Sequence, residues 1–117
     1  MEALNEYEGM SVEECIKACT ACYHECLSCL NHCLILGGVH SNVNHVTTML
    51  ECAQICNSCS MMMQLKGKFS YELCQLCSRI CDACEASCLT IGKEDAMMMK
   101  CADTCRRCAD ACRSMAH

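Results

Sequence analysis

The sequence predicts an all-α protein, an antiparallel up-down-up-down four-helix bundle with a cysteine-lined core. Cysteine supplies 18 of the 117 residues and falls into four runs. Within a run the cysteines follow one another at steps of three or four residues, which places them on one face of an α-helix. Proline is absent, so long helices are not interrupted. The few glycines lie outside the runs, where helices are expected to begin or end.

The first two helices are expected at about residues 12–36 and 42–66. The first run is Cys15, Cys19, Cys22, Cys26, Cys29 and Cys33, and the second is Cys52, Cys56 and Cys59. Ser11 and Glu14 form a potential capping box at the start of the first helix. Ser41 or Asn42 is the expected N-cap of the second.

The last two helices are expected at about residues 70–91 and 94–115. The third run is Cys74, Cys77, Cys81, Cys84 and Cys88, and the fourth is Cys101, Cys105, Cys108 and Cys112. Ser70 is the expected N-cap of the third helix. The fourth has no good cap, but Glu94 and Asp95 place negative charge at its start. Short loops favour antiparallel neighbours, and the length fits a single domain over residues 1–117.

Composition and charge exclude several classes of function. Short chains this rich in cysteine are often secreted disulfide scaffolds. The segment from Met1 to Met10, however, is acidic and polar and has neither the basic nor the apolar region of a signal peptide. We therefore expect a cytoplasmic protein with reduced thiols. No segment reaches the roughly 18 apolar residues of a membrane span. The net charge of −5 without a basic stripe argues against nucleic acid as a partner.

The aligned thiols are expected to bind metal ions, and their number favours Cu(I). Thiolates are soft ligands that select Cu(I), zinc or iron–sulfur clusters. A zinc site with four thiolates keeps a double negative charge, so a core filled with such sites would bury charge at high cost. Cu(I) accepts two or three thiolates, and one thiolate bridges two ions. Roughly one Cu(I) per cysteine would then give a neutral core.

Cysteines four residues apart on one helix are the expected ligand pairs, since their sulfur atoms can span one Cu(I) ion. Cys59 and Cys74 lack a cysteine partner at this spacing. Cys59 instead has Met63 four residues later, so a site of one thiolate and one thioether is expected there.

Both ends of the predicted bundle carry additional soft donors. One end, the histidine mouth, contains Cys33, His40, His45, Met49, Cys88, Met97, Met98, Met99 and Cys101. The opposite end, the far mouth, contains Cys15, Met61, Met62, Met63, Cys74, Cys112, Met115 and His117. His45 continues the cysteine stripe, so we expect copper to load at the histidine mouth. His45, Met49, Met98 and Met63 are the additional candidate ligands, whereas His24 and His32 are expected on the surface.

The outer faces of the helices differ in polarity. Apolar residues flank the cysteines of the first and third helices, among them Leu27, Leu34 and Leu76, whereas the fourth shows charged residues such as Arg106 and Asp110. This difference predicts that the first and third helices contact other subunits of a homo-oligomer while the fourth faces water.

The pattern as a whole resembles the cytosolic bacterial copper storage proteins. The run C-x3-C-x2-C-x3-C-x2-C-x3-C at residues 15–33 and the shorter runs on three further helices carry the resemblance, which covers essentially the whole chain. It implies a homotetramer of bundles, metal binding at the eighteen cysteines, and copper loading at an end that bears histidine and methionine. The second helix has only three cysteines, so fewer or mixed sites are expected near it.

High-capacity storage and detoxification of Cu(I), without catalysis, is therefore the predicted function, with copper donor and acceptor proteins as further partners. Two alternatives remain open at this point: a metallothionein-like buffer for zinc or cadmium, and a thiol redox protein. A ferredoxin-type cluster is disfavoured, because its cysteine run has successive steps of three and a proline, and this chain has neither.

Overall fold

The computed structural model describes the backbone of residues 2–115 and the side chains of residues 12–115. Four α-helices account for most of the chain: α1 (Glu2–Leu36), α2 (Val43–Gln64), α3 (Ser70–Ile91) and α4 (Ala96–Met115). A short 3-10 helix, η1 (Gly38–Ser41), follows α1. No strand occurs within residues 2–115. The all-α prediction is confirmed. Helices α2, α3 and α4 both begin and end within two residues of their predicted limits.

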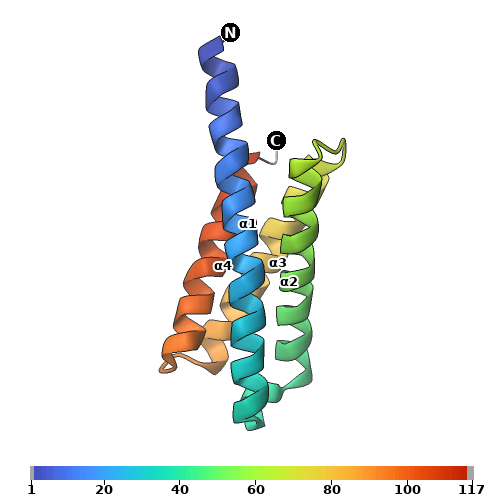
Figure 1. The fold of residues 1–117 in the computed structure, drawn as a ribbon. Coiled ribbons are helices and arrows are strands. Elements are labelled where there is room, and N and C mark those ends of the chain that lie inside the picture. The colour runs from blue at the N-terminus through green and yellow to red at the C-terminus, as the bar shows by residue number, and fades with distance from the viewer. Residues whose placement is uncertain (1, 116–117) are drawn as a thin grey trace.

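The four helices run alternately up and down around a common axis (Figure 1). Helices α1 and α3 each pack against both α2 and α4 and face each other diagonally. The molecule measures 53 × 22 × 19 Å along its principal axes. This is the antiparallel four-helix bundle that the cysteine runs and short loops predict.

Helix α1 begins much earlier than its sequence predicts. It starts at Glu2 rather than near residue 12, and its first turns project beyond the other three helices (Figure 1). Ser11 is therefore inside the helix and is not its N-cap. The physical reason is that Gly9 costs a helix only about 1 kcal/mol relative to alanine. The residues that precede it include the strong helix formers Glu2, Ala3 and Leu4.

The other helix starts confirm one predicted cap and correct two. Asn42 caps α2, because its side-chain oxygen accepts a hydrogen bond of 2.9 Å from the backbone N–H of Asn44. Ser70 is the first residue of α3 rather than its cap, and its hydroxyl donates to the Gly67 carbonyl at 2.7 Å. Asp95 caps α4, since its carboxylate accepts from the Met98 N–H at 3.0 Å. The expectation that α4 lacks a good cap is therefore wrong.

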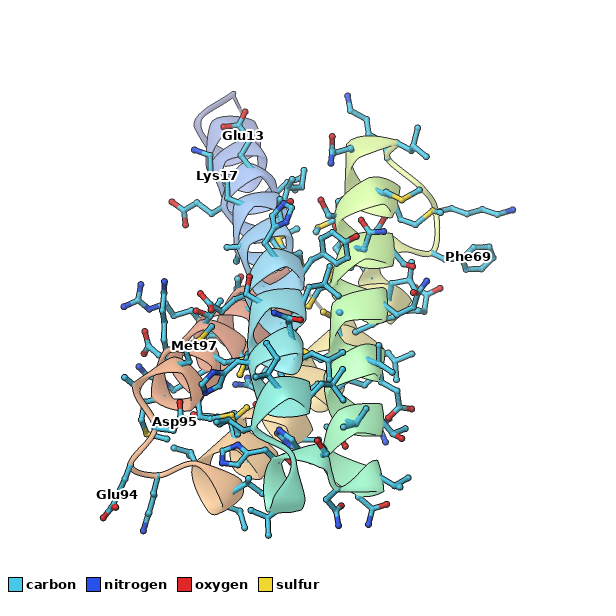
Figure 2. All side chains as sticks on the ribbon, turned by 60° about the horizontal axis from the view of Figure 1, so that its bottom comes forward. Glu13, Lys17, Phe69, Glu94, Asp95 and Met97 are labelled. Atoms are coloured by element: carbon cyan, nitrogen blue, oxygen red, sulfur yellow. The ribbon has the colours of Figure 1, made fainter. Side chains whose placement is uncertain are left out.

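The bundle core consists of sulfur-bearing side chains. All eighteen cysteines are buried with at most 1% exposure, and Met49, Met98 and His45 are equally enclosed. In Figure 2, sulfur atoms gather in the space between the four ribbons. The other buried apolar residues of the same cluster are Leu30, Ala53, Met63, Ala102, Ala109 and Met115. The cysteine stripes thus take the place that leucine and isoleucine hold in ordinary bundles.

Three of the helices carry large apolar side chains on their outer surface. Exposed large apolar side chains include Leu34 on α1, Val43 and Leu50 on α2, and Leu76 on α3, whereas none is exposed within residues 96–115. The polarity difference between α1 or α3 and α4 agrees with the sequence prediction. The cysteine pattern did not indicate the exposed apolar side chains of α2. Within residues 2–115, no helix is both long and apolar enough to cross a membrane.

Candidate metal centre

The eighteen predicted ligands all point into one enclosed core. Every one of them is a free thiol, so none is joined in a disulfide. Each helix contributes one stripe, because steps of three and four residues keep successive side chains on the same face. The four stripes meet along the bundle axis and form a continuous column of sulfur atoms.

The short sulfur–sulfur contacts mostly join different helices. Cys56 Sγ on α2 lies 3.7 Å from both Cys77 Sγ and Cys81 Sγ on α3, and 3.8 Å from Cys108 Sγ on α4. Cys22 Sγ on α1 makes a contact of 3.8 Å with Cys105 Sγ on α4.

Two of the intrahelical pairs expected from the sequence, Cys22–Cys26 and Cys77–Cys81, also approach within 3.9 and 3.8 Å. The other thiol hydrogen bonds in the described part of the chain cross between helices, although Cys101/Cys105 and Cys108/Cys112 also lie within 4.8 Å of each other. The spacing of the cysteines thus identified the candidate ligands, but the packing of the helices decides which sulfur atoms lie closest together.

Groups of four cysteines lie close enough to hold one ion each. In each group all four sulfur atoms fall within 4.8 Å of one another. Five of these groups are Cys19/Cys77/Cys108/Cys112, Cys22/Cys52/Cys56/Cys81, Cys22/Cys26/Cys52/Cys105, Cys26/Cys84/Cys101/Cys105 and Cys56/Cys77/Cys81/Cys108. Successive groups share members, so neighbouring ions could be bound only through bridging thiolates. This arrangement suits a soft ion that accepts few ligands and forms clusters, rather than a row of isolated tetrahedral sites.

Contacts between neighbouring thiols and burial both affect the pKa values of the core cysteines. Contacts with Cys105 and Cys108 lower the pKa of Cys22, whereas contacts with Cys101 and Cys22 raise the pKa of Cys105. Burial raises the pKa of Cys33 because the thiolate is poorly solvated there. A metal ion that binds to these thiols must therefore displace protons, and its charge then compensates the thiolates.

The histidine mouth brings together a mixed set of donors. Cys33 Sγ lies 3.4 Å from His45 Nε2 and 3.3 Å from Met98 Sδ. Met98 Sδ also lies 3.4 Å from Cys29 Sγ. Burial lowers the pKa of His45, which favours the neutral imidazole that binds metals. Two thiols, one thioether and one imidazole thus converge at the end of the sulfur column.

Ser87 orients the His45 ring and was not identified from the sequence. Its hydroxyl lies 2.6 Å from His45 Nδ1. A hydrogen bond donated by Nδ1–H to this oxygen leaves the Nε2 lone pair directed at Cys33, as in metal-binding histidines held by an outer partner. The sequence feature that could have indicated this role is the position of Ser87 directly before Cys88 on α3.

The other predicted residues of this mouth occupy different environments. Met49 is fully buried, but no cysteine thiol among residues 12–115 donates a hydrogen bond to its sulfur. His40 Nδ1 is 3.9 Å from Cys33 Sγ. His24 is exposed, as predicted. His32 is not a free surface residue, because its Nε2 lies 2.7 Å from Asp95 Oδ2 and ties the end of α1 to the start of α4. Figure 2 shows Asp95 and Met97 at this forward end.

At the far mouth, the two cysteines without an intrahelical partner contact each other. Cys59 Sγ on α2 and Cys74 Sγ on α3 are 3.4 Å apart. The short thioether contact of Met63 is with Cys74, at 3.8 Å, rather than with Cys59 as its spacing indicated. Met115 is buried beside this group, and His117 lies outside the described residues. Met61 is exposed and Met62 half-buried, so these two do not join the core.

Comparison with known proteins adds independent information. Residues 8–117 match the family model described as copper storage protein. The cysteine-rich protein YhjQ of Bacillus subtilis strain 168 is 39% identical over 102 residues, which cover 80% of this chain and 92% of that protein.

Solved structures share the fold. The Nmul_A1745 protein of Nitrosospira multiformis is 40% identical and superposes with a TM-score of 0.85 over 92% of this chain and 96% of its own. The Cu(I)-bound copper storage protein BsCsp3 is 38% identical, with a TM-score of 0.83 over 92% of this chain and 99% of its own.

Proposed function

Because the chain belongs to the copper storage protein family, we propose that it stores Cu(I) ions on the thiolates of its core. The observation that supports this most directly is the sharing of cysteines between successive four-thiol groups. Shared thiols allow each sulfur to bridge two ions, which is typical of Cu(I) bound to thiolates. BsCsp3, similar over nearly its whole length, has been solved with Cu(I) bound.

Charge balance favours Cu(I) over zinc or cadmium in this core. The cysteines are at most 1% exposed, so uncompensated charge would be costly. One Cu(I) for each thiolate leaves the column neutral, whereas divalent ions with four thiolates each leave it negative. We therefore propose a capacity of roughly one Cu(I) per cysteine, with all eighteen cysteines as ligands.

The proposed loading site is the histidine mouth. His45 and Met98 contact Cys33 there, and neutral donors of this kind accept Cu(I) weakly enough to pass it on to thiolates. Met49 at the same mouth and Met63 at the far mouth are the additional candidate ligands. Copper donor and acceptor proteins would exchange ions with these ends.

The physiological setting follows from the same proposal. The function is binding rather than catalysis, the whole chain acts as one storage domain, and the reduced thiols fit the cytoplasm. The exposed apolar side chains on α1, α2 and α3, with a groove lined by Leu50, Ile55 and Ile80, support self-association, and a homotetramer is the proposed state.

Anaerobic titration of the reduced protein with Cu(I), in the presence of a competing chelator, tests the function. Storage predicts saturation at roughly one Cu(I) per cysteine and little displacement by zinc. Saturation at about a quarter of that number, with equal competition by zinc, would identify a divalent-metal buffer. Reversible disulfides in the isolated protein, without copper uptake, would identify a redox protein.

A further inference from the structure

A cavity of about 600 Å³ opens at the far mouth. It lies between residues 12–16 of α1, the α2–α3 loop and the end of α4, with Val12, Ile16 and Tyr71 among its lining residues. Its volume is typical of sites for small organic ligands, which span about 300–1,000 Å³. The loading function proposed for the histidine mouth makes no use of this cavity.

The inner end of the cavity consists of soft donors. Cys74, Met63 and Met115 line it, and all three are buried with less than 10% exposure. Behind them, Cys74 Sγ contacts Cys59 Sγ at 3.4 Å and Met63 Sδ at 3.8 Å. A Cu(I) ion held by Cys59 and Cys74 would therefore be the stored ion that a molecule in the cavity reaches first.

The charged residues that line the cavity are two cations and one anion. Lys66 and Lys68 belong to the α2–α3 loop, and Glu13 to α1. All three are exposed, so they can rearrange around a ligand. A small peptide thiol with two carboxylates and one ammonium group carries the complementary set of charges. Its sulfur is also the ligand that competes best with a protein thiolate for Cu(I).

We propose that this cavity binds a small anionic peptide thiol, which withdraws stored Cu(I) through the far mouth. The inference rests on the proposed storage function and adds a release route to it. The Met63 thioether, a weak neutral donor, gives way first to the incoming sulfur. Two incoming thiols then take the ion away as a bis-thiolate complex of Cu(I). One of their protons replaces Cu(I) on the Cys59–Cys74 pair, so the core stays neutral, and the other proton is released to solvent. Copper stays monovalent throughout, and no oxidant or reductant is needed.

The experiment measures thiol-dependent copper loss from the fully loaded protein under anaerobic conditions. Glutathione is the probe, bathocuproine disulfonate is the terminal copper sink, and the rate with the sink alone is subtracted. Cysteamine, a thiol without carboxylates, is the comparison probe. The test variant combines Lys66→Asn with Lys68→Gln. Asparagine is chosen because Lys66 has a positive φ of 55°, which asparagine tolerates better than most residues.

The control variant is Lys93→Gln, which removes an exposed lysine from the α3–α4 loop at the histidine mouth. At low ionic strength the test variant should lose about threefold or more of the glutathione-dependent rate. It should keep the cysteamine-dependent rate, and Lys93→Gln should behave like the unmodified protein with both thiols.

Equal glutathione rates in the test variant and the unmodified protein would overturn the inference. An equal loss of the glutathione-dependent rate in Lys93→Gln would also overturn it. So would an equal loss of the cysteamine-dependent rate in the test variant, because either result would indicate a general effect of charge. The copper content before thiol addition separates the two proposals. A protein that loads fully but shows no cavity effect leaves storage intact, whereas one that does not load refutes both.

Discussion

The contact between Gly92 and Met98 makes Gly92→Ala a sharp test of how the histidine mouth is built. Gly92 is buried in the α3–α4 turn. A methyl group added there would lie 2.5 Å from Met98 Cβ and 3.1 Å from Met98 Cε. Carbon atoms in contact normally lie about 3.5–4.0 Å apart. Because Met98 Cβ is attached directly to the backbone, the start of α4 must move by roughly 1 Å to relieve the overlap.

The size of the effect follows from two opposing contributions. Overpacking of this kind costs about 1–3 kcal/mol. Replacing glycine by alanine returns about 0.4–1 kcal/mol by restricting the unfolded chain, because φ at Gly92 is −127° and alanine can adopt it. The net loss should be about 1–2 kcal/mol. For a chain of 117 residues this lowers the melting temperature by about 4–8 °C, given about 2.1 cal/mol/K of unfolding entropy per residue.

Thermal unfolding of the reduced protein, followed by circular dichroism, measures this change. Gly67→Ala is the matched control, because its added methyl would meet nothing closer than the Met62 carbonyl oxygen at 3.4 Å. The control should be neutral or slightly more stable. The shift of α4 should also move Met98 Sδ away from Cys33 and slow copper uptake. Equal melting temperatures for the Gly92 variant and the unmodified protein would refute the reasoning, as would equal losses in both variants.

Three further predictions concern capping, capacity and pH. Asp95→Ala should lower the unfolding free energy in urea by about 0.5–2 kcal/mol through loss of the α4 cap; Asp95→Asn, which can still cap, should lose less, and equal losses would contradict the cap. Cys56→Ser should reduce Cu(I) capacity by one or two ions at roughly unchanged helix content; collapse of the helical signal would contradict this. Folding lowers the pKa of His45. As pH falls below about 6.5, His45 of the unfolded chain therefore becomes protonated before His45 of the folded chain. Stability in urea should therefore decrease in this window, and less so in His45→Gln.

The cysteine spacing was sufficient to identify the core. Steps of three and four residues can lie on one face only if the chain is helical, and all eighteen cysteines of the four stripes are in fact buried. The same reasoning placed His45 on a stripe and Met98 at the histidine mouth, and both contact Cys33. Such patterns are local, so the sequence displays them directly.

Helix starts were predicted less well because local signals compete there. Ser11 and Gly9 suggested a boundary, yet α1 continues back to Glu2. Asp95 was recognised only as a negative charge, although its carboxylate caps α4 and binds His32. That second contact joins residues 63 positions apart in the sequence. A pairing at such a distance depends on how the helices pack.

The sequence by itself determined that four helices present thiols to a shared interior, because helical periodicity converts spacing into direction. It also determined the soft-metal chemistry, because ligand type is a property of each residue. Only the tertiary structure decided which sulfur atoms meet. Cys59 and Cys74 find each other across α2 and α3, and Ser87 reaches His45 from α3. The cavity at the far mouth likewise exists only after three segments are packed together. These features depend on the relative rotation and axial shift of whole helices, which the spacing within one helix does not specify.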